Sequence, residues 1–372
     1  TVRLDESESP EPLREGDLLT LDGSTGRVYT GALDVVASTT VDELRELMTW
    51  ADQVRRMRVY AEADTPQAAR AALSYGAEGV GLCRTERMFF AKDRLFAMRC
   101  ALLAIDNEQR SQWLMELERA QRDDFVEIFQ AMDGRPVTIR LLDRALGEFL
   151  PQEEEPLQAI ADALHLELEE VTKAAERHRE SNPAFGHRGV RAGLTVPGLY
   201  DMQLRAMLFA ARDCTDQGVP VELEVLIPMV AFTSELEALC AVLNSVHQQV
   251  FAEPESLFTC RVGAMIEVPR ECLIDDELAR YTYFFSFGSN DLTQTTLGVS
   301  RDDASRFLPT YLNTLCMVPR DPFTNLDDRV AELMAMALER AKAIRPDLVA
   351  GLCGDQGGSP DSIEICERLG LD

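Results

Sequence analysis

The stretches VGAMIEV (262–268) and YFFSFGSND (283–291) decide the fold class. Each is an almost unbroken apolar run that ends in polar residues, which is typical of a strand buried on both faces of a parallel sheet. Five further runs have this character and are separated by amphipathic, helix-like stretches: RVYAEAD (58–64), GVGLCRT (79–85), VTIRLLD (137–143), LEVLIPMV (223–230) and VAGLCGD (349–355). Seven such strands favour an α/β fold of the (β/α)₈ TIM-barrel type over an open doubly wound sheet, which is the alternative.

An eighth strand is missing from this pattern. The last helical stretch, at about 360–369, leads into Gly370, Leu371 and Asp372, where a βα unit would ordinarily pass into the next strand. We therefore expect a TIM-type barrel that lacks its eighth strand in this chain. An unusual open barrel is the alternative.

The chain is expected to hold more than the barrel. Residues 1–16 are acidic and resemble a tail, and residues 17–36 suggest two short strands around the turns Asp22-Gly23 and Thr25-Gly26. A hairpin this small is not stable alone, so we interpret residues 1–36 as a tail and the end of a preceding domain. Residues 37–56 form a linker helix with Thr40 or Asp42 as its N-cap, and the barrel occupies 57–372, with a helical, acidic insertion at 146–182.

Composition limits the classes of function. The 372 residues include 37 Lys+Arg and 64 Asp+Glu, which gives a net charge of −27. This charge argues against a general nucleic-acid binder and against docking on an anionic membrane, but a few placed arginines could still hold a small phosphorylated substrate. No apolar run approaches the length of a membrane span, and no signal peptide is recognisable. The nine cysteines are scattered singly, which suits a reducing compartment and predicts a cytoplasmic protein.

Polar residues stand where the predicted strands end. In a (β/α)₈ barrel the C-terminal ends of the strands form one mouth, and the chemistry is found there. We expect the following residues to converge on that mouth: Arg84, Glu86, Arg140, Asp143, Glu267, Asn290, Asp291, Cys353 and Asp355.

These residue types suggest a particular chemistry. Glu267 and Asp291 are hard oxygen donors that suit Mg²⁺, or alternatively they are partners in structural ion pairs. Arg84 and Arg140 suit bidentate contacts to phosphate or carboxylate, or alternatively they neutralise Glu86 and Asp143. Cys353 lies between glycines and could act as an acid at carbon, or it could be a small buried hydrophobe.

The histidines carry little signal. His165, His178 and His247 lie in helical stretches and are predicted to be surface residues. His187 lies in the loop NPAFGHRGVRAG, where it could orient a ligand or hydrogen-bond within the loop. No Walker-type phosphate loop and no cysteine–histidine metal spacing is present.

At these motifs the chain resembles the C-terminal phosphoenolpyruvate (PEP)/pyruvate-binding barrel of the pyruvate phosphate dikinases, within the family of PEP-utilising enzymes. The resemblance runs from about residue 16 to the end. It is carried, in the family's order, by GAEGVGLCRTERMFF (76–90), PVTIRLLD (136–143), NPAFGHRGVRAG (182–193), GAMIEVPR (263–270), FFSFGSNDLTQTTLGVSRDD (284–303), FLPTYL (307–312) and GLCGDQGG (351–358). The opening EGDLLTLDGSTGRVYTG looks like the end of the family's swivelling phosphohistidine domain.

The resemblance implies roles for individual residues. Arg84 and Arg140 would hold the phosphate or carboxylate of PEP, and Glu267 and Asp291 would bind Mg²⁺. Cys353 would protonate C3 of the enolate. The remaining implied residues would contact substrate or add positive charge around the phosphoryl group: Gly288, Ser289, Asn290, Arg191 and Arg301.

The resemblance also implies partners. The chain lacks the family's ATP-grasp domain and its Thr-Ser-His-Ala phosphohistidine motif. It would therefore catalyse phosphoryl transfer only with a phosphohistidine domain of the same or another chain, and it would form a homodimer.

Three departures from the family pattern leave alternatives open. Arg144, Ala145 and Gly147 replace Pro-Pro and His, Asp355 and Gln356 replace Glu-His, and Arg87 stands where His is usual. A PEP-sensing relative without turnover is one alternative. A PEP synthase-type enzyme, or a lyase that uses a Mg²⁺-bound pyruvate enolate, is another.

Overall fold

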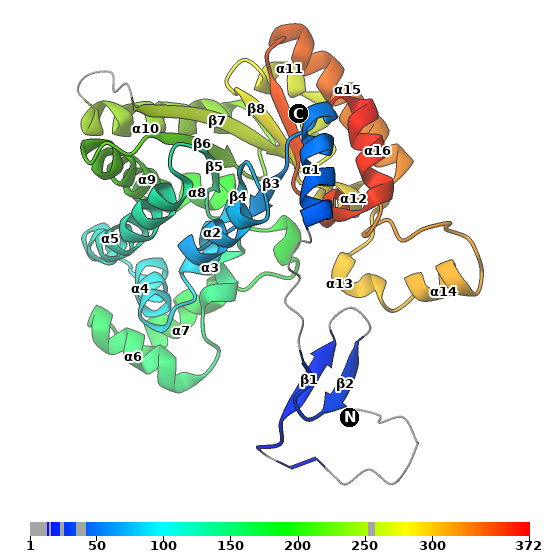
Figure 1. Ribbon diagram of the computed structural model, residues 1–372. Coiled ribbons are helices and arrows are strands. Elements are labelled where there is room, and N and C mark those ends of the chain that lie inside the picture. The colour runs from blue at the N-terminus through cyan, green and yellow to red at the C-terminus, as the bar shows by residue number, and fades with distance from the viewer. Residues whose placement is uncertain (1–12, 15, 23–25, 35–41, 252–256) are drawn as a thin grey trace. The chain divides into compact units, whose positions relative to one another are not determined.

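The computed structural model describes residues 13–14, 16–22, 26–34, 42–251 and 257–372 (Figure 1). The chain divides into two compact units, residues 1–55 and 56–372.

The first unit contains a hairpin and a helix. Strands β1 (Leu19–Asp22) and β2 (Arg27–Thr30) pair in antiparallel fashion, with Leu19 opposite Thr30 and Asp22 opposite Arg27. The two strands expected between residues 17 and 36 are therefore present, although turn residues 23–25 lie outside the described residues. Helix α1 runs over Asp42–Val54, so Asp42 is its first residue, and Thr40, the other expected cap, lies outside the described residues.

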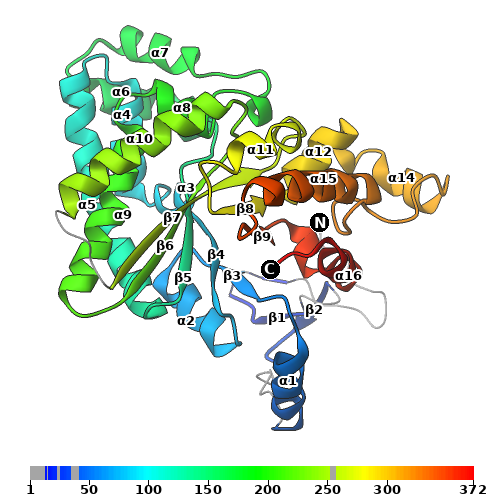
Figure 2. The ribbon, with the colours of Figure 1, turned by 90° about the horizontal axis from the view of Figure 1, so that it is seen from above.

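The second unit is built on a seven-stranded parallel sheet. Its strands are β3 (Tyr60–Glu62), β4 (Gly79–Arg84), β5 (Pro136–Arg140), β6 (Val221–Ile227), β7 (Phe258–Ile266), β8 (Phe284–Phe287) and β9 (Val349–Leu352). They are ordered β3-β4-β5-β6-β7-β8-β9, and the sheet curls as part of a barrel (Figure 2). The order has no reversal, which excludes the doubly wound alternative and confirms a TIM-type barrel that is one strand short.

Helices follow almost every strand. They are α2 (Pro66–Ser74), α3 (Thr85–Met88), α4 (Lys92–Leu103), α5 (Asn107–Met132), α6 (Glu154–Leu164), α7 (Leu168–Arg177), α8 (Val190–Thr195), α9 (Leu199–Asp216), α10 (Thr233–Val250), α11 (Asp275–Leu278), α12 (Ser289–Leu297), α13 (Arg301–Ala304), α14 (Leu308–Asn313), α15 (Asp328–Ile344) and α16 (Pro360–Leu369). Short 3₁₀ turns are η1 (Leu146–Phe149), η2 (Pro183–Phe185), η3 (Glu271–Leu273) and η4 (Asp355–Gly358). None of the helices described is long and apolar enough to cross a membrane.

The strand sequences explain why the sheet is buried. Val137, Ile139, Val225, Ala264 and Phe285 come from four successive strands, and each is at most 1% exposed. They join one large apolar core with the inner faces of the surrounding helices. Burial on this scale, at about 25 cal/mol per Å² of apolar surface, is the main force that holds the sheet to its helices.

The sheet is open between its edge strands β3 and β9, which are not paired with each other among the described residues. Asp372 crosses this opening at one point. Its carbonyl oxygen accepts a hydrogen bond from the amide of Arg58 at 2.8 Å, and its own amide donates to the carbonyl of Ala350 at 2.8 Å. One residue therefore makes backbone bonds toward both edges, as a strand between them would.

The helical insertion expected at 146–182 is confirmed as η1, α6 and α7. Leu157, Ile160 and Val171 of this segment pack with Cys100 and Leu103 in a small separate core. Gly147 lies so close to the backbone that a Cβ there would collide with the carbonyl oxygen of His178. A histidine at position 147 would therefore require the backbone at His178 to shift.

The expected surface position of the histidines is confirmed for His165 only. His178 is half-buried at the end of α7. His247 is also half-buried, because its ring stacks on Phe258 with the ring centroids 5.9 Å apart. The sequence pattern predicts exposure for both because helical spacing alone does not reveal a neighbouring aromatic ring or a packed helix end.

Candidate active site

A cavity of about 1200 Å³ opens at the C-terminal ends of the strands. Eight of the ten site residues expected from the sequence line it: Arg84, Arg140, Glu267, Gly288, Asn290, Asp291, Arg301 and Cys353. They lie in β4, β5, α12 and α13, or directly after β7, β8 and β9. The barrel topology thus brings together side chains that are up to 269 positions apart in the sequence, from Arg84 to Cys353.

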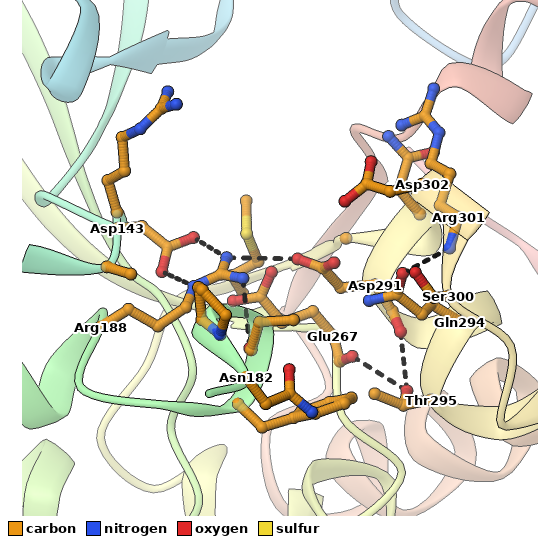
Figure 3. Close-up of a pocket in the computed structure, with 18 of the residues that line it drawn as sticks. Asp143, Asn182, Arg188, Glu267, Asp291, Gln294, Thr295, Ser300, Arg301 and Asp302 are labelled. Atoms are coloured by element: carbon orange, nitrogen blue, oxygen red, sulfur yellow. Dashed lines mark hydrogen bonds and ion pairs between the residues drawn. The ribbon is translucent and has the colours of Figure 1, made fainter. Parts of the chain in front are cut away.

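A buried ionic network forms one wall of the cavity (Figure 3). Arg140 donates from Nη2 to Glu86, and its Nη1 lies 3.0 Å from Asp143 Oδ2. Arg188 grips Asp143 with two hydrogen bonds, Nε to Oδ1 at 3.0 Å and Nη2 to Oδ2 at 2.7 Å. Its Nη2 also reaches Asp291 Oδ2 at 3.3 Å, so Arg188 lies between the two aspartates.

The carboxylates hold both arginines in their charged form. Burial alone would lower the pKa of Arg140, but Glu86, Asp143 and Glu267 outweigh it and raise that pKa above its usual value. The pKa of Arg188 is raised for the same reason, chiefly by Asp143. Each guanidinium is therefore a permanent cation whose position is fixed by anions before any ligand arrives.

Glu267 follows β7 and is only 1% exposed. Its Oε1 accepts a hydrogen bond from the amide of Met229 at 2.8 Å. Burial, together with the negative charges of Asp143 and Asp291, raises its pKa well above the usual value. A buried carboxylate that is repelled by two neighbouring carboxylates is a site where a cation would relieve the electrostatic cost.

The residues present fit Mg²⁺. Glu267 and Asp291 both face the cavity and are hard oxygen donors. In the described part of the chain, no cluster of three or more metal-binding side chains occurs. Mg²⁺ usually takes one or two carboxylates and completes its shell with water and substrate oxygens, which agrees with this donor set.

Cys353 lies at the floor of the cavity, half-buried against the apolar side chains of Leu82, Leu226, Met265 and Phe284. Its Sγ donates to the carbonyl oxygen of Phe287 at 3.4 Å. Burial is the main cause that raises the pKa of the thiol to about 11. Cys353 is therefore protonated at neutral pH and can supply a proton.

The turn from β8 into α12 depends on close packing. A Cβ on Gly288 would lie 2.8 Å from Cβ of Glu267, so any residue larger than glycine would clash here. Asn290 accepts a hydrogen bond from the amide of Asp355 at 3.1 Å. Ser289 is fully buried beneath the cavity wall and donates to Gln356 Oε1 at 2.7 Å.

Gln356, one of the departures from the family pattern, serves as an internal bridge. It is fully buried, and its Nε2 donates to the carbonyl oxygen of Pro322 at 3.1 Å. Its neighbour Asp355 pairs with Arg301, which is exposed on α13 across the mouth. These two changed residues therefore tie the end of β9 to α12 and α13.

Two expected site residues lie elsewhere. Ser289 is covered, as described above, and Arg191 is not among the residues that line the cavity. The Nη1 of Arg191 instead donates to the carbonyl oxygens of Phe185 and Gly186, both at 3.1 Å. Nearby His187 contacts the Thr195 hydroxyl. Both side chains stabilise the loop whose residues Ser181–Phe185 line the cavity.

The sequence motifs do not single out several residues of the cavity. They point to Arg191 rather than to Arg188, three positions earlier in the same motif, although Arg188 joins Asp143 to Asp291. Arg144 also lines the cavity, with its guanidinium 5.0 Å above the Phe90 ring and 2.6 Å from Glu148. Its place in a changed motif at the end of a strand is the signal that could have found it.

Comparison with known proteins agrees with this geometry. The model of a family described as "PEP-utilising enzyme, PEP-binding domain" matches residues 38–372. The chain belongs to the family of PEP-utilising enzymes. This confirms the family resemblance inferred from the sequence motifs.

The similar PEP-utilising enzymes carry consistent names. The chain is 45% identical over 363 residues to pyruvate, phosphate dikinase 1, chloroplastic, of Arabidopsis thaliana. It is 44% identical over 362 residues to pyruvate, phosphate dikinase of Rhizobium meliloti, and 42% identical over 359 residues to that of Giardia intestinalis. The matched regions cover 96–97% of this chain but only 38–40% of each relative.

Proposed function

We propose that this chain is the PEP/pyruvate-binding part of a phosphotransferase of the pyruvate, phosphate dikinase type. In this proposal, a phosphoryl group passes between PEP and a histidine supplied by another segment of the same or another chain. The supporting observation is one cavity that holds arginines, two carboxylates suited to Mg²⁺ and a protonated thiol on an apolar floor. The names of the similar proteins support the same reaction class.

The arginines would hold the substrate's anionic groups. Arg84 and Arg140 border the cavity, and each has a buried Nε without a hydrogen-bond partner among the described residues. A phosphate or carboxylate oxygen would satisfy such donors. Glu267 and Asp291 would hold Mg²⁺, which supplies charge stabilisation for substrate oxygens.

Cys353 would deliver the proton. When the phosphoryl group leaves PEP for the histidine nitrogen, the P–O bond breaks and an N–P bond forms. The Sγ–H proton of Cys353 then goes to C3 of the enolate, which gives pyruvate and a thiolate. In the reverse direction the thiolate removes that proton. The apolar side chains of Leu82, Met265 and Phe284, which pack against Cys353, would limit the access of water to the enolate.

The remaining parts of the proposal concern context. The hairpin of residues 17–36 would be the end of a preceding phosphohistidine-type domain. The chain would function in the cytosol as a homodimer, and light scattering on the purified chain measures that oligomeric state.

Calorimetric titration tests the function. PEP and oxalate, an enolate mimic, are titrated into the chain with and without Mg²⁺. We expect Mg²⁺-dependent binding that is abolished by Glu267→Gln and strongly weakened by Arg140→Ala. Arg320→Gln is the matched control, because Arg320 forms an exposed ion pair with Asp361 and does not line the cavity. Absence of binding to the folded wild-type chain contradicts the proposal, and cleavage of a 2-oxo acid would favour the lyase alternative.

A further inference from the structure

Two arginines at the mouth share one carboxylate. Glu62 ends β3, Arg84 ends the neighbouring strand β4, and Arg87 follows in α3. Glu62 Oε2 is 3.0 Å from Arg84 Nη2, and Glu62 Oε1 is 3.0 Å from Arg87 Nη1. The two oxygens of one side chain thus bind two different guanidinium groups.

Asp64 completes the cluster. Its Oδ2 lies 2.7 Å from the same Arg87 Nη1, and its Oδ1 accepts a hydrogen bond from the backbone amide of Arg84 at 2.5 Å. Arg87 therefore touches both carboxylates that touch Arg84. Arg84 lines the cavity, whereas Glu62, Asp64 and Arg87 do not.

The charges in this cluster determine how strongly a ligand must compete with Glu62 for the guanidinium of Arg84. With Arg87 present, two cations face two anions, and Glu62 divides its attraction between them. Without Arg87, the negative charges of Glu62 and Asp64 would both act on Arg84 alone. Glu62 would then compete more strongly with an incoming oxyanion for Arg84 Nη2.

We propose that Arg87 is a positioning residue that shares the charge of Glu62 with Arg84 and so sets the strength with which Arg84 holds an anionic substrate. The inference rests on the proposed function, because it requires Arg84 to bind PEP. The inference also explains why an arginine could be useful at position 87, where the family usually has histidine. An arginine supplies this positive charge at every accessible pH, since its side chain is not deprotonated in proteins.

A double-mutant cycle tests the proposal. PEP affinity is measured with Mg²⁺ for wild type, Arg87→Gln, Glu62→Gln and the double variant. Arg87→Gln should weaken binding about threefold, the size typical of coupling between partly exposed charges. Glu62→Gln should tighten binding by a similar factor, because it removes the competing carboxylate. In the Glu62→Gln background, Arg87→Gln should change the affinity less than about twofold.

The cycle distinguishes an effect of Arg87 that passes through Glu62 from a direct effect of its charge. An equal weakening by Arg87→Gln in both backgrounds would mean that Arg87 acts without Glu62, and it would overturn the inference alone. Arg320→Gln controls for removal of one exposed positive charge, and it should leave PEP affinity unchanged. A wild-type chain that does not bind PEP would overturn the proposed function and this inference together. Both substituted side chains are at least one-third exposed, so the variants are expected to fold.

Discussion

The two walls of the cavity hold their arginines in different ways. On one wall Arg140 and Arg188 have side chains only 10% and 14% exposed, and both bind the fully buried Asp143. On the other wall Arg301 is 45% exposed and pairs with Asp355, which is 53% exposed. The ion pairs of Asp143 are part of the folded core, and a ligand could break them only at a large cost in free energy. The pair of Arg301 with Asp355 can be exchanged for a ligand at little cost.

This difference suggests a division of labour. The buried wall fixes the geometry of the site before substrate binds, so little ordering remains to be done at that moment. The exposed wall carries a cation that can change partners, which would suit the phosphoryl transfer proposed for this site. The apolar floor with Cys353 lies within the same cavity and would provide the proton in the proposed reaction.

We expect the largest effect from substitution of Cys353, which lies on the cavity floor and not on either wall. Cys353→Ala removes the proposed acid and should lower the rate of the PEP–pyruvate half-reaction by about a hundredfold or more, as is usual for loss of a general acid. The affinity for PEP should stay nearly unchanged, because the thiol does not hold an anionic group. Single-turnover kinetics with a separately supplied phosphohistidine domain measure the rate, and calorimetry measures the affinity.

Cys353→Ser is the conservative control for this experiment. Its hydroxyl has similar size but a much higher pKa than the thiol, so it should restore little of the rate. A Cys353→Ala chain with full activity would remove Cys353 from the mechanism.

The pH dependence of alkylation tests the state of the floor directly. The thiol has a pKa of about 11, so its reactive thiolate should increase about tenfold per pH unit from about pH 8 to pH 10. An unperturbed thiol, with a pKa near about 8.5, would level off within this range. Mass spectrometry of the Cys353 peptide after timed iodoacetamide treatment gives the rate. A plateau near pH 9 would contradict the burial of this side chain.

The next largest effect should come from the buried wall. Asp143→Asn removes the negative charge shared by Arg140 and Arg188, and it leaves two buried cations short of a partner. We expect a loss of about 3 kcal/mol in the free energy of unfolding, the usual size when one member of a buried ion pair is lost. Urea unfolding with Asp361→Asn as the exposed control measures it. A loss below about 1 kcal/mol, the range of an exposed pair, would show that the wall is not held by this pairing.

The strands could be predicted from the sequence, but not all members of the ionic network in the buried wall could. The central strands were recognisable because burial on both faces demands a nearly unbroken apolar run, as in Phe284–Phe287. The polar residues at the strand ends were recognisable because the barrel brings these ends together. Eight of the ten expected residues therefore line one cavity.

The sequence could not predict which charged residues pair with each other, because pairing depends on distances between segments far apart in the chain. From the sequence, Glu86 and Asp143 could be simple counterions for arginines, and the structure shows them as parts of a network that also includes Arg188. Arg188 and Arg191 lie three positions apart, and no pattern in the sequence distinguishes them. The loop places one against Asp143 and the other on its own carbonyl groups.

We expect the smallest effect from substitution of Arg301 on the exposed wall. Arg301→Gln should weaken PEP binding about fivefold without changing the free energy of unfolding, because its pair with Asp355 is exposed and contributes little to stability. Asp355→Asn should have the opposite sign and tighten PEP binding slightly, since it frees Arg301. Because exposed charges are screened by salt, the affinity lost between about 0.05 and 0.5 M NaCl, about a threefold change in screening length, should be larger for wild type than for Arg301→Gln. If Arg301→Gln instead destabilised the fold as strongly as Asp143→Asn does, the two walls would not differ in the way described, and Arg301 would belong with the structural cations.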